Sequence, residues 1–150
     1  QGEAVIQSKE TCWLGESTSY KDLGSKEQES FNSARLKSVM TKWGYLEAFT
    51  INGDKWGADI LFYRSSDGAV LKVQLKGRPF LDKHYCGKDI HIAFEDKTTQ
   101  VWYVYPHDDL MEVVLKSGRL LGTQSWDTRG SWSWSYIPKW LGKIITKWTI

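Results

Sequence analysis

Few features of the sequence point outside the cell or into a membrane. Its 150 residues include only two cysteines, Cys12 and Cys86, which are too few for a disulfide framework or an all-cysteine zinc site. No apolar run approaches the length that spans a bilayer. Repeats, low-complexity tracts and Pro/Gly-rich linkers are also missing. We therefore expect two free thiols, no membrane partner and a cytoplasmic location in a bacterial, phage or organellar setting.

Cys86 has two histidines near it in the sequence, His84 and His91, and these raise the alternative of a metal site. The spacing of the three residues matches no zinc pattern. Thiols stay reduced in a cytoplasm, so free cysteines remain the favoured interpretation.

Charge is unevenly distributed along the chain. From residue 119 onward five basic residues accompany a single acidic one, Asp127, whereas the first 118 residues carry a net charge of −2. A basic end joined to a near-neutral body is suited to phosphate contacts. A merely solvated basic face explains the same charges equally well, so both interpretations stay open.

A helix is predicted from Ser25 to about Trp43. The run Ser25-Lys26-Glu27-Gln28 is typical of a capping box, in which Ser25 is the N-cap and Gln28 reaches back to it. Gly44 supplies a C-terminal stop.

Five β-strands and a second helix are predicted to follow. In the clearest strand apolar and polar residues alternate, so Gln74 and Lys76 share one face. The turn Asp67-Gly68 joins this strand to the one before it as a hairpin. The order of elements predicts a mixed α/β (α+β) fold with a mostly antiparallel sheet. The strands are expected at residues 45–51 (ended by the turn Asn52-Gly53), 59–63, 70–76, 90–94 and 101–105, and the helix at 108–116.

The chemistry is expected where Gly57-Ala58-Asp59 meets Gln74-Leu75-Lys76 across the hairpin. Residues two apart in a strand share a face, so Gln74 and Lys76 can both address one small volume beside Asp59. A carboxylate and an amide carbonyl suit Mg²⁺, which prefers oxygen ligands. A lysine beside that metal can position or deprotonate a water, or offset charge on a phosphate. These needs match phosphodiester hydrolysis; the plain alternative is a surface hairpin with scattered polar residues.

Glu29 is the candidate for a third ligand. At 100° per residue it falls on the same helical face as Leu36, Met40 and Trp43, whereas Glu27 lies on the opposite side. A carboxylate that ends an apolar stripe is costly to bury without a partner. The alternative is a surface glutamate stabilised by the helix dipole, but together with Asp59, Gln74 and Lys76 we favour Glu29 as a site residue.

These residues resemble the motif of the PD-(D/E)XK nuclease superfamily. The variant with Gln74 before x-Lys is similar to the group of a cyanobacterial group I intron homing endonuclease, and the resemblance extends over residues 25–116. It implies a restriction-endonuclease-like core, a mixed, mostly antiparallel sheet flanked by helices. It also implies that Asp59, Gln74 and Glu29 bind Mg²⁺, for which Mn²⁺ can substitute, and that Lys76 serves the attacking water.

Two positions depart from that motif: Ala58 replaces proline, and Gln74 removes one negative charge. The second departure weakens the expected metal affinity and puts the two-metal version of the mechanism in doubt. A catalytically silent DNA-binding module is therefore one alternative to an enzyme. The expected function is a site-specific endonuclease of homing or restriction type, and a junction-resolving or structure-specific nuclease is the other alternative.

The expected partners are double-stranded DNA and further copies of the chain. One such site cuts one strand, so double-strand cleavage calls for a homodimer or homotetramer. Several basic residues are candidates for phosphate contacts, although a solvated charge explains each of them as well. The candidates are Lys72, Arg78, Lys83, His84, Lys88, Lys139 and Lys143.

Residues 119–150 form a Trp-rich basic extension of what we expect to be a single domain, residues 1–150. Five of the nine tryptophans lie in the last 25 positions. Trp132, Trp134 and Tyr136 alternate with serines and predict a strand, and a short helix is expected over 139–148. The favoured role is to cover the core and contact another subunit; the alternative is to grip DNA by stacking.

Overall fold

The structure is a computed structural model in which residues 11–50 and 59–150 are described. The chain divides into two compact units, residues 1–35 and 36–150, and each is described by itself. The predicted turn Asn52-Gly53, and Gly57 and Ala58 of the proposed motif, lie outside the described residues.

Helices and short strands alternate along the described chain. The longer elements are α1 (Ser25–Thr41), β3 (Tyr45–Thr50), β4 (Ile60–Arg64), β5 (Ala69–Leu75), β7 (Ile90–Asp96), β8 (Val101–Pro106), α2 (His107–Lys116) and α3 (Lys139–Ile145). The short elements are β1 (Thr11–Cys12), β2 (Gly15–Glu16), η1 (Tyr20–Asp22), β6 (Phe80–Asp82), η2 (Lys83–Tyr85), η3 (Ser125–Arg129), β9 (Ser131–Ser133) and η4 (Thr146–Trp148).

Helix α1 begins where the sequence predicts it, but the expected capping box is wrong. The first helical hydrogen bond runs from Gln28 N to Gly24 O (2.9 Å), so Gly24 is the capping residue and Ser25 lies inside the helix. The Gln28 side chain donates to Tyr20 O (3.0 Å) instead of reaching back to Ser25. At the other end α1 stops at Thr41, two residues before the predicted end, and Gly44 in the turn that follows takes φ +84°, which favours glycine.

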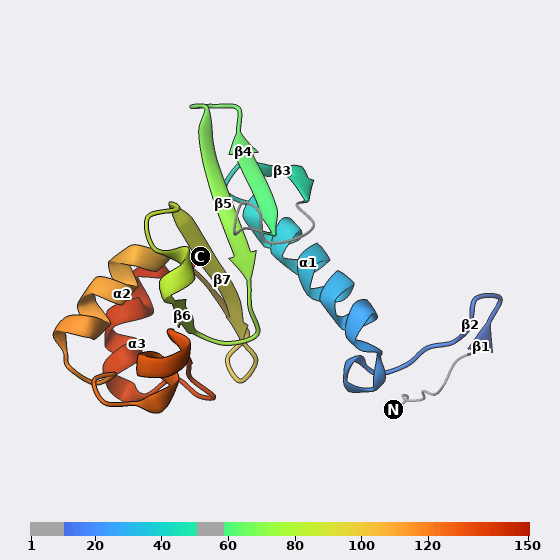
Figure 1. Cartoon of the computed structure of the whole chain (residues 1–150). Coiled ribbons are helices and arrows are strands. Elements are labelled where there is room, and N and C mark those ends of the chain that lie inside the picture. Colours follow the sequence, from blue (N-terminus) through green and yellow to red (C-terminus); the bar gives the residue numbers. More distant parts are fainter. Residues whose placement is uncertain (1–10, 51–58) are drawn as a thin grey trace. The chain divides into compact units, whose positions relative to one another are not determined.

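Five strands form a mixed sheet in the order β3-β4-β5-β7-β8 (Figure 1). Three neighbouring pairs are antiparallel, and only β5 and β7 run parallel. With helices packed against it, this sheet confirms the predicted mixed α/β class. The predicted strand boundaries differ from the observed ones by one or two residues.

Both faces of the sheet carry apolar cores because residues of opposite parity are buried on opposite sides. One face, which we call the α1 face, buries Ile60, Phe62 and Val73 against Leu36 and Met40 of α1. The other, the α2 face, buries core residues of β7 and β8 against α2 and α3, which lie side by side (Figure 1). Members of this second core include Ile92, Phe94, Tyr105, Leu110 and Leu141.

The hairpin turn between β4 and β5 is the one predicted from Asp67-Gly68. Gly68 N donates to Arg64 O (2.8 Å), and Gly68 has φ +74°. Two nitrogens of Arg64 donate to the Asp67 carboxylate, and this interaction lowers the pKa of Asp67 to about 2. The turn thereby fixes the register that brings Asp59 opposite β5.

The chain crosses from β5 to β7 through two short elements, β6 and η2. Strand β6 pairs with β9, so the crossover is tied to the C-terminal segment. A three-residue strand is too short to show a sequence period. The strand β6 was not predicted, and β9 was predicted as part of a longer strand.

The tryptophan-rich extension covers the core of the α2 face. Trp126 and Trp134 are buried there, and Trp132, Trp140 and Trp148 pack against the same core. The strand predicted over Trp132, Trp134 and Tyr136 extends only from Ser131 to Ser133, so Trp134 and Tyr136 lie beyond β9, and Tyr136 is 72% exposed. The predicted core-covering role is therefore confirmed. Among the described residues, none of the helices has the length and apolar character needed to cross a bilayer.

Candidate functional site

Asp59 and Gln74 meet on the α2 face of the sheet. Asp59 N donates to Val73 O (3.0 Å), which starts the β4–β5 ladder. Gln74 Nε2 donates to one carboxylate oxygen of Asp59 (3.2 Å), and the backbone N–H of Leu75 donates to the other (3.2 Å). Gln74 is 8% exposed and Asp59 is half-buried. These two predicted site residues are therefore brought together.

Lys76 follows β5 directly and is held by aromatic rings. Its backbone N–H donates to Ala93 O (2.9 Å), which continues the parallel pairing with β7. Its ammonium nitrogen lies 4.5 Å from the ring centroid of Phe80 and 5.8 Å from that of Tyr85. The faces of such rings attract cations. Lys76 thus sits beside the crossover, and within the described chain it makes no salt bridge.

The oxygen donors of Asp59 and Gln74 fit Mg²⁺ in kind. Magnesium keeps several waters and is commonly held by one or two carboxylates together with substrate phosphate. A carboxylate oxygen can accept more than one interaction, so the bonds from Gln74 and Leu75 do not by themselves prevent Asp59 from binding a metal. Gln74 turns its NH₂ group toward Asp59, so its carbonyl oxygen would reach a shared ion only after the amide rotates.

Glu29 and Glu27 are both exposed on α1, so burial does not separate them. Glu29 belongs to the unit of residues 1–35, and Asp59 belongs to the other unit. The role of Glu29 as a third ligand therefore stays a prediction. On the same helix Leu36 and Met40 are buried as predicted, whereas Trp43 is 54% exposed and lies beyond the helix end.

The predicted phosphate-contacting residues are spread over several elements. Lys72 lies half-buried on β5, next to the Gln74 position. In the crossover the Lys83 ammonium lies 4.9 Å from the Trp126 ring centroid, and Lys88 Nζ lies 3.3 Å from His84 Nε2. The remaining three are exposed, one after β5 and two on α3: Arg78, Lys139 and Lys143.

Beyond Lys76 the surface is hollowed by a cavity of about 400 Å³. Arg78, Trp134 and Tyr136 contribute to its lining. Its floor includes Glu95, which is 5% exposed and accepts from Lys97 Nζ at 3.4 Å. The sequence did not predict this cavity, because its walls come from three segments that are far apart along the chain.

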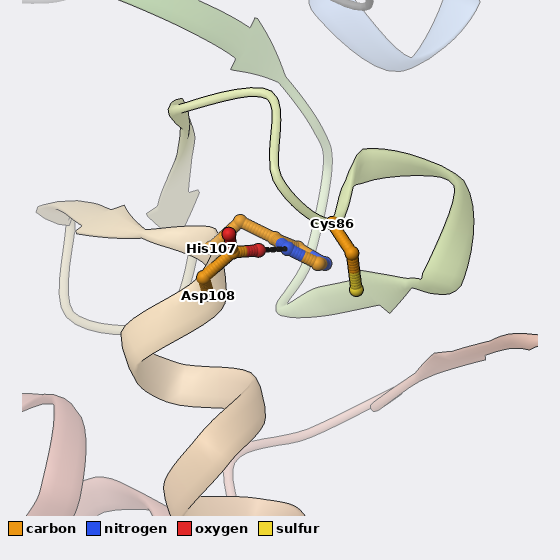
Figure 2. A group of neighbouring side chains, drawn as sticks. All are labelled: Cys86, His107 and Asp108. Carbon is orange, nitrogen blue, oxygen red and sulfur yellow. Dashed lines mark hydrogen bonds and ion pairs between the residues drawn. The ribbon is translucent and has the colours of Figure 1, made fainter.

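A second polar cluster, also missed by the sequence, joins the crossover to α2 (Figure 2). Ligand-type atoms of Cys86, His107 and Asp108 lie within 4.8 Å of one another. It is the sole such group among the described residues, and it excludes His84 and His91. The alternative of a metal site built from Cys86, His84 and His91 is therefore wrong.

Both ring nitrogens of His107 already take part in hydrogen bonds. Asp82 N donates to Nε2 (3.0 Å), which therefore carries no proton, and the protonated Nδ1 donates to Asp108 (2.9 Å). The other oxygen of Asp108 accepts from Gly87 N (2.9 Å). Since His107 is 1% exposed, a metal could bind only by breaking one of these buried bonds.

Cys86 is also unsuited to act as a nucleophile or metal ligand. Its sulfur lies 3.0 Å from Met111 Sδ, and no hydrogen bond joins it to His107 in the described structure. Desolvation, followed by the nearby Asp108 and Asp82 carboxylates, raises the pKa of the thiol. A reactive or coordinating cysteine needs its thiolate form. We therefore interpret this cluster as a structural tie between the crossover and α2.

The resemblance to the PD-(D/E)XK nucleases rests on Asp59, Gln74 and Lys76 and on the strands that carry them. In the structure Asp59 and Gln74 are joined by a hydrogen bond of 3.2 Å, and Lys76 directly follows β5, the strand that carries Gln74. In comparisons with known proteins, no family model, no curated protein and no solved structure matches the chain.

Proposed function

We propose that the chain is a metal-dependent endonuclease that cleaves double-stranded DNA at specific sites, on a restriction-endonuclease-like core. The observation that supports this proposal is the hydrogen bond between Gln74 and Asp59, with Lys76 two residues further along the same face. A carboxylate, an amide and an ammonium on one strand pair are what hydrolysis of a phosphodiester needs.

Each side chain has a separate role in this proposal. Asp59 and Gln74, with Glu29 as third ligand, would hold Mg²⁺ or Mn²⁺. The bound metal would lower the pKa of a coordinated water and offset charge on the phosphate. Lys76, kept at the edge of the site by Phe80 and Tyr85, would orient the attacking water and stabilise the additional negative charge of the transition state.

Plasmid cleavage tests this function. With Mg²⁺ the protein should give discrete linear fragments, and with EDTA it should give none. Lys76→Ala should lower the cleavage rate about 100-fold or more, because a positioned proton-transfer group contributes at least that much. The matched control is Lys116→Ala, an exposed lysine on α2 that pairs with Glu112, and it should cleave normally. Absence of cleavage with either metal would overturn the proposal.

A catalytically silent DNA-binding module is the second candidate. It is favoured by the bonds that engage Asp59 and by the position of the Lys76 ammonium over two rings rather than beside the carboxylate. Such a module would bind DNA without cutting it, and Lys76→Ala would change nothing. Cutting confined to four-way junctions would instead indicate a junction-resolving enzyme.

A homodimer or homotetramer goes with the double-strand activity, because each chain carries one such site. Analytical ultracentrifugation of the free protein and of its DNA complex measures this directly. A strictly monomeric protein that still linearises plasmid in one step would contradict the expected assembly.

A further inference from the structure

The half of the α2 face formed by β3, β4 and β5 exposes apolar and aromatic side chains. Phe49 is 54% exposed, Leu46 48%, Val70 55% and Tyr63 39%. On the same face of β7 and β8, Ile92, Phe94 and Tyr105 are at most 1% exposed beneath α2 and α3. Within the part of the chain that the structure describes, this face of the sheet is therefore covered over β7 and β8 and open over β3, β4 and β5.

The strand register arranges these side chains in rows, because directly paired residues lie on the same face. In the first row Leu46 pairs with Tyr63, and Tyr63 pairs with Val70. In the second row Phe49 pairs with Leu61, and Leu61 pairs with Lys72.

The third row consists of Asp59 and Gln74, the pair joined by the 3.2 Å hydrogen bond. It adjoins the Phe49–Leu61–Lys72 row, because Ile60 pairs with Val73 and fixes the register between them. The exposed aromatic rows therefore lead directly to the candidate catalytic pair, with Lys72 between them.

A second copy of the chain is a poor occupant for this surface, because it would cover Asp59 and Gln74. Duplex DNA is also poorly matched, since its bases are stacked inside and it presents phosphates to a flat surface. Exposed aromatic rings on an open sheet bind unpaired bases by stacking, and neighbouring cations follow the phosphates. Phe49, Tyr63 and Lys72 supply both elements.

We propose that this open half binds a single-stranded segment of the substrate. Its bases stack on Phe49 and Tyr63, and its backbone passes Lys72 to reach Asp59 and Gln74. This inference rests on the proposed nuclease function and adds one step to it: the duplex is opened beside the cleaved bond, so that one unpaired strand lies on this surface.

The test measures binding without metal, so that it does not depend on cleavage. Fluorescence anisotropy with EDTA compares a labelled single-stranded oligothymidylate with a duplex of equal length. Phe49→Ala and Tyr63→Ala should each weaken single-strand binding about tenfold, as expected for loss of one stacked base. Tyr63→Phe should keep the affinity, because the ring remains.

The control is Tyr136→Ala, which removes a tyrosine that lies outside the sheet and is more exposed (72%) than Tyr63 (39%). It should leave single-strand binding within about twofold of wild type, which is less than the loss of one stacking contact. Circular dichroism should show all variants folded, because each changed side chain is substantially exposed.

Two outcomes overturn the inference. One is single-strand affinity that neither Phe49→Ala nor Tyr63→Ala changes. The other is a dimer that these variants dissociate in a protein that does not bind single strands. If plasmid cleavage still depends on Lys76 in that case, the proposed function stands without the inference. If the aromatic variants lose binding but no DNA is ever cut, the binding surface stands and the nuclease function fails.

Discussion

In the second unit the carboxylates of Asp59 and Asp108 both accept a hydrogen bond from a side chain and another from a backbone N–H. The side-chain donor to Asp59 is the amide of Gln74, which rotates about a single bond and can exchange its NH₂ for a carbonyl oxygen. The donor to Asp108 is His107, which is fully buried and bound at its other nitrogen by Asp82 N.

The difference shows that a cluster of ligand-type residues is not sufficient for a site. Cys86, His107 and Asp108 satisfy the geometric condition for a metal, but the two His107 nitrogens are already used within the protein. The partner of Asp59, the Gln74 amide, can instead rotate and present its carbonyl oxygen to an ion. The two carboxylates therefore differ in their side-chain partners: the Gln74 amide can present an oxygen to a metal, whereas both nitrogens of His107 are held in hydrogen bonds.

The largest expected effect is on catalysis and compares two isosteric substitutions. Asp59→Asn should lower Mg²⁺-dependent cleavage about 100-fold or more, because the proposed metal loses the carboxylate of Asp59. Asp108→Asn should leave the rate within about threefold, since Asp108 takes no part in the proposed chemistry. The measurement is the initial rate of plasmid linearisation.

DNA binding and thermal melting provide the controls for this pair. Asp59→Asn should bind DNA as tightly as wild type or more tightly, because a negative charge near phosphate is removed. Asp108→Asn should lose about 1 kcal/mol of stability at most, since its side chain is half-exposed and the bonds are partly screened. Equal losses of activity in the two variants would end the distinction between them.

Much of the sheet could be predicted because alternation is a local property. Along β5, Val73 faces the core of the α1 face and Gln74 faces the other side, as the alternating sequence pattern indicates. The hairpin could be predicted from Asp67-Gly68, because this dipeptide favours a tight turn through local backbone preferences, without contacts from the rest of the fold. The short strand β6 could not be predicted, and β9 was predicted only as part of a longer strand, since each is stabilised by the other across a long stretch of chain.

The candidate site was predictable only in part. Strand periodicity places Gln74 and Lys76 on one face, and the motif supplies Asp59. The rings beside the Lys76 ammonium belong to Phe80 and Tyr85 in the crossover. The alternation of residues along β5 does not extend to the crossover, so this contact could not be predicted. The bonds of His107 to Asp82 and Asp108 likewise depend on how the crossover packs on α2.

The second effect concerns stability and tests whether His107 is a structural tie. His107→Ala should lower the free energy of unfolding by about 2–4 kcal/mol, because it leaves a cavity and an unsatisfied Asp82 N–H. His84→Ala, a change at an exposed histidine, should cost less than about 0.5 kcal/mol. Urea unfolding measures both. If His107→Ala lowered the free energy of unfolding only slightly, the cluster of Cys86, His107 and Asp108 would not be a structural tie and would again be a candidate functional site.

A smaller effect, on the pH dependence of stability, is expected from His91. Unlike His107, which is hydrogen-bonded at both ring nitrogens, His91 has a buried ring nitrogen, Nδ1, without such a bond in the described structure. Desolvation lowers the pKa of His91 from its usual value of 6.5. The neutral ring is thus favoured in the fold, and its contribution to stability is present above that value and is lost as the pH falls through the folded pKa.

Urea unfolding at about pH 7.5 and about pH 5 should therefore show a smaller acid-induced loss of stability for His91→Gln than for wild type. The Gln side chain does not titrate, so it removes this contribution to the pH dependence. His84→Gln, an exposed control, should retain the wild-type pH dependence. An unchanged pH dependence in His91→Gln would mean that the ring gains solvent or a partner in solution.

The smallest expected effect is the response of the Cys86 cluster to a thiolate-binding metal. Co²⁺ or Zn²⁺ bound by Cys86 and His107 would stabilise the fold by mass action and deprotonate the thiol. Because the His107 nitrogens are engaged and the pKa of Cys86 is raised, we expect no cobalt–thiolate absorption band. The melting temperature should also stay within about 1 °C. A band that disappears in Cys86→Ser but persists in Cys12→Ser would show that the cluster rearranges to bind metal, and the contrast with Asp59 would no longer hold.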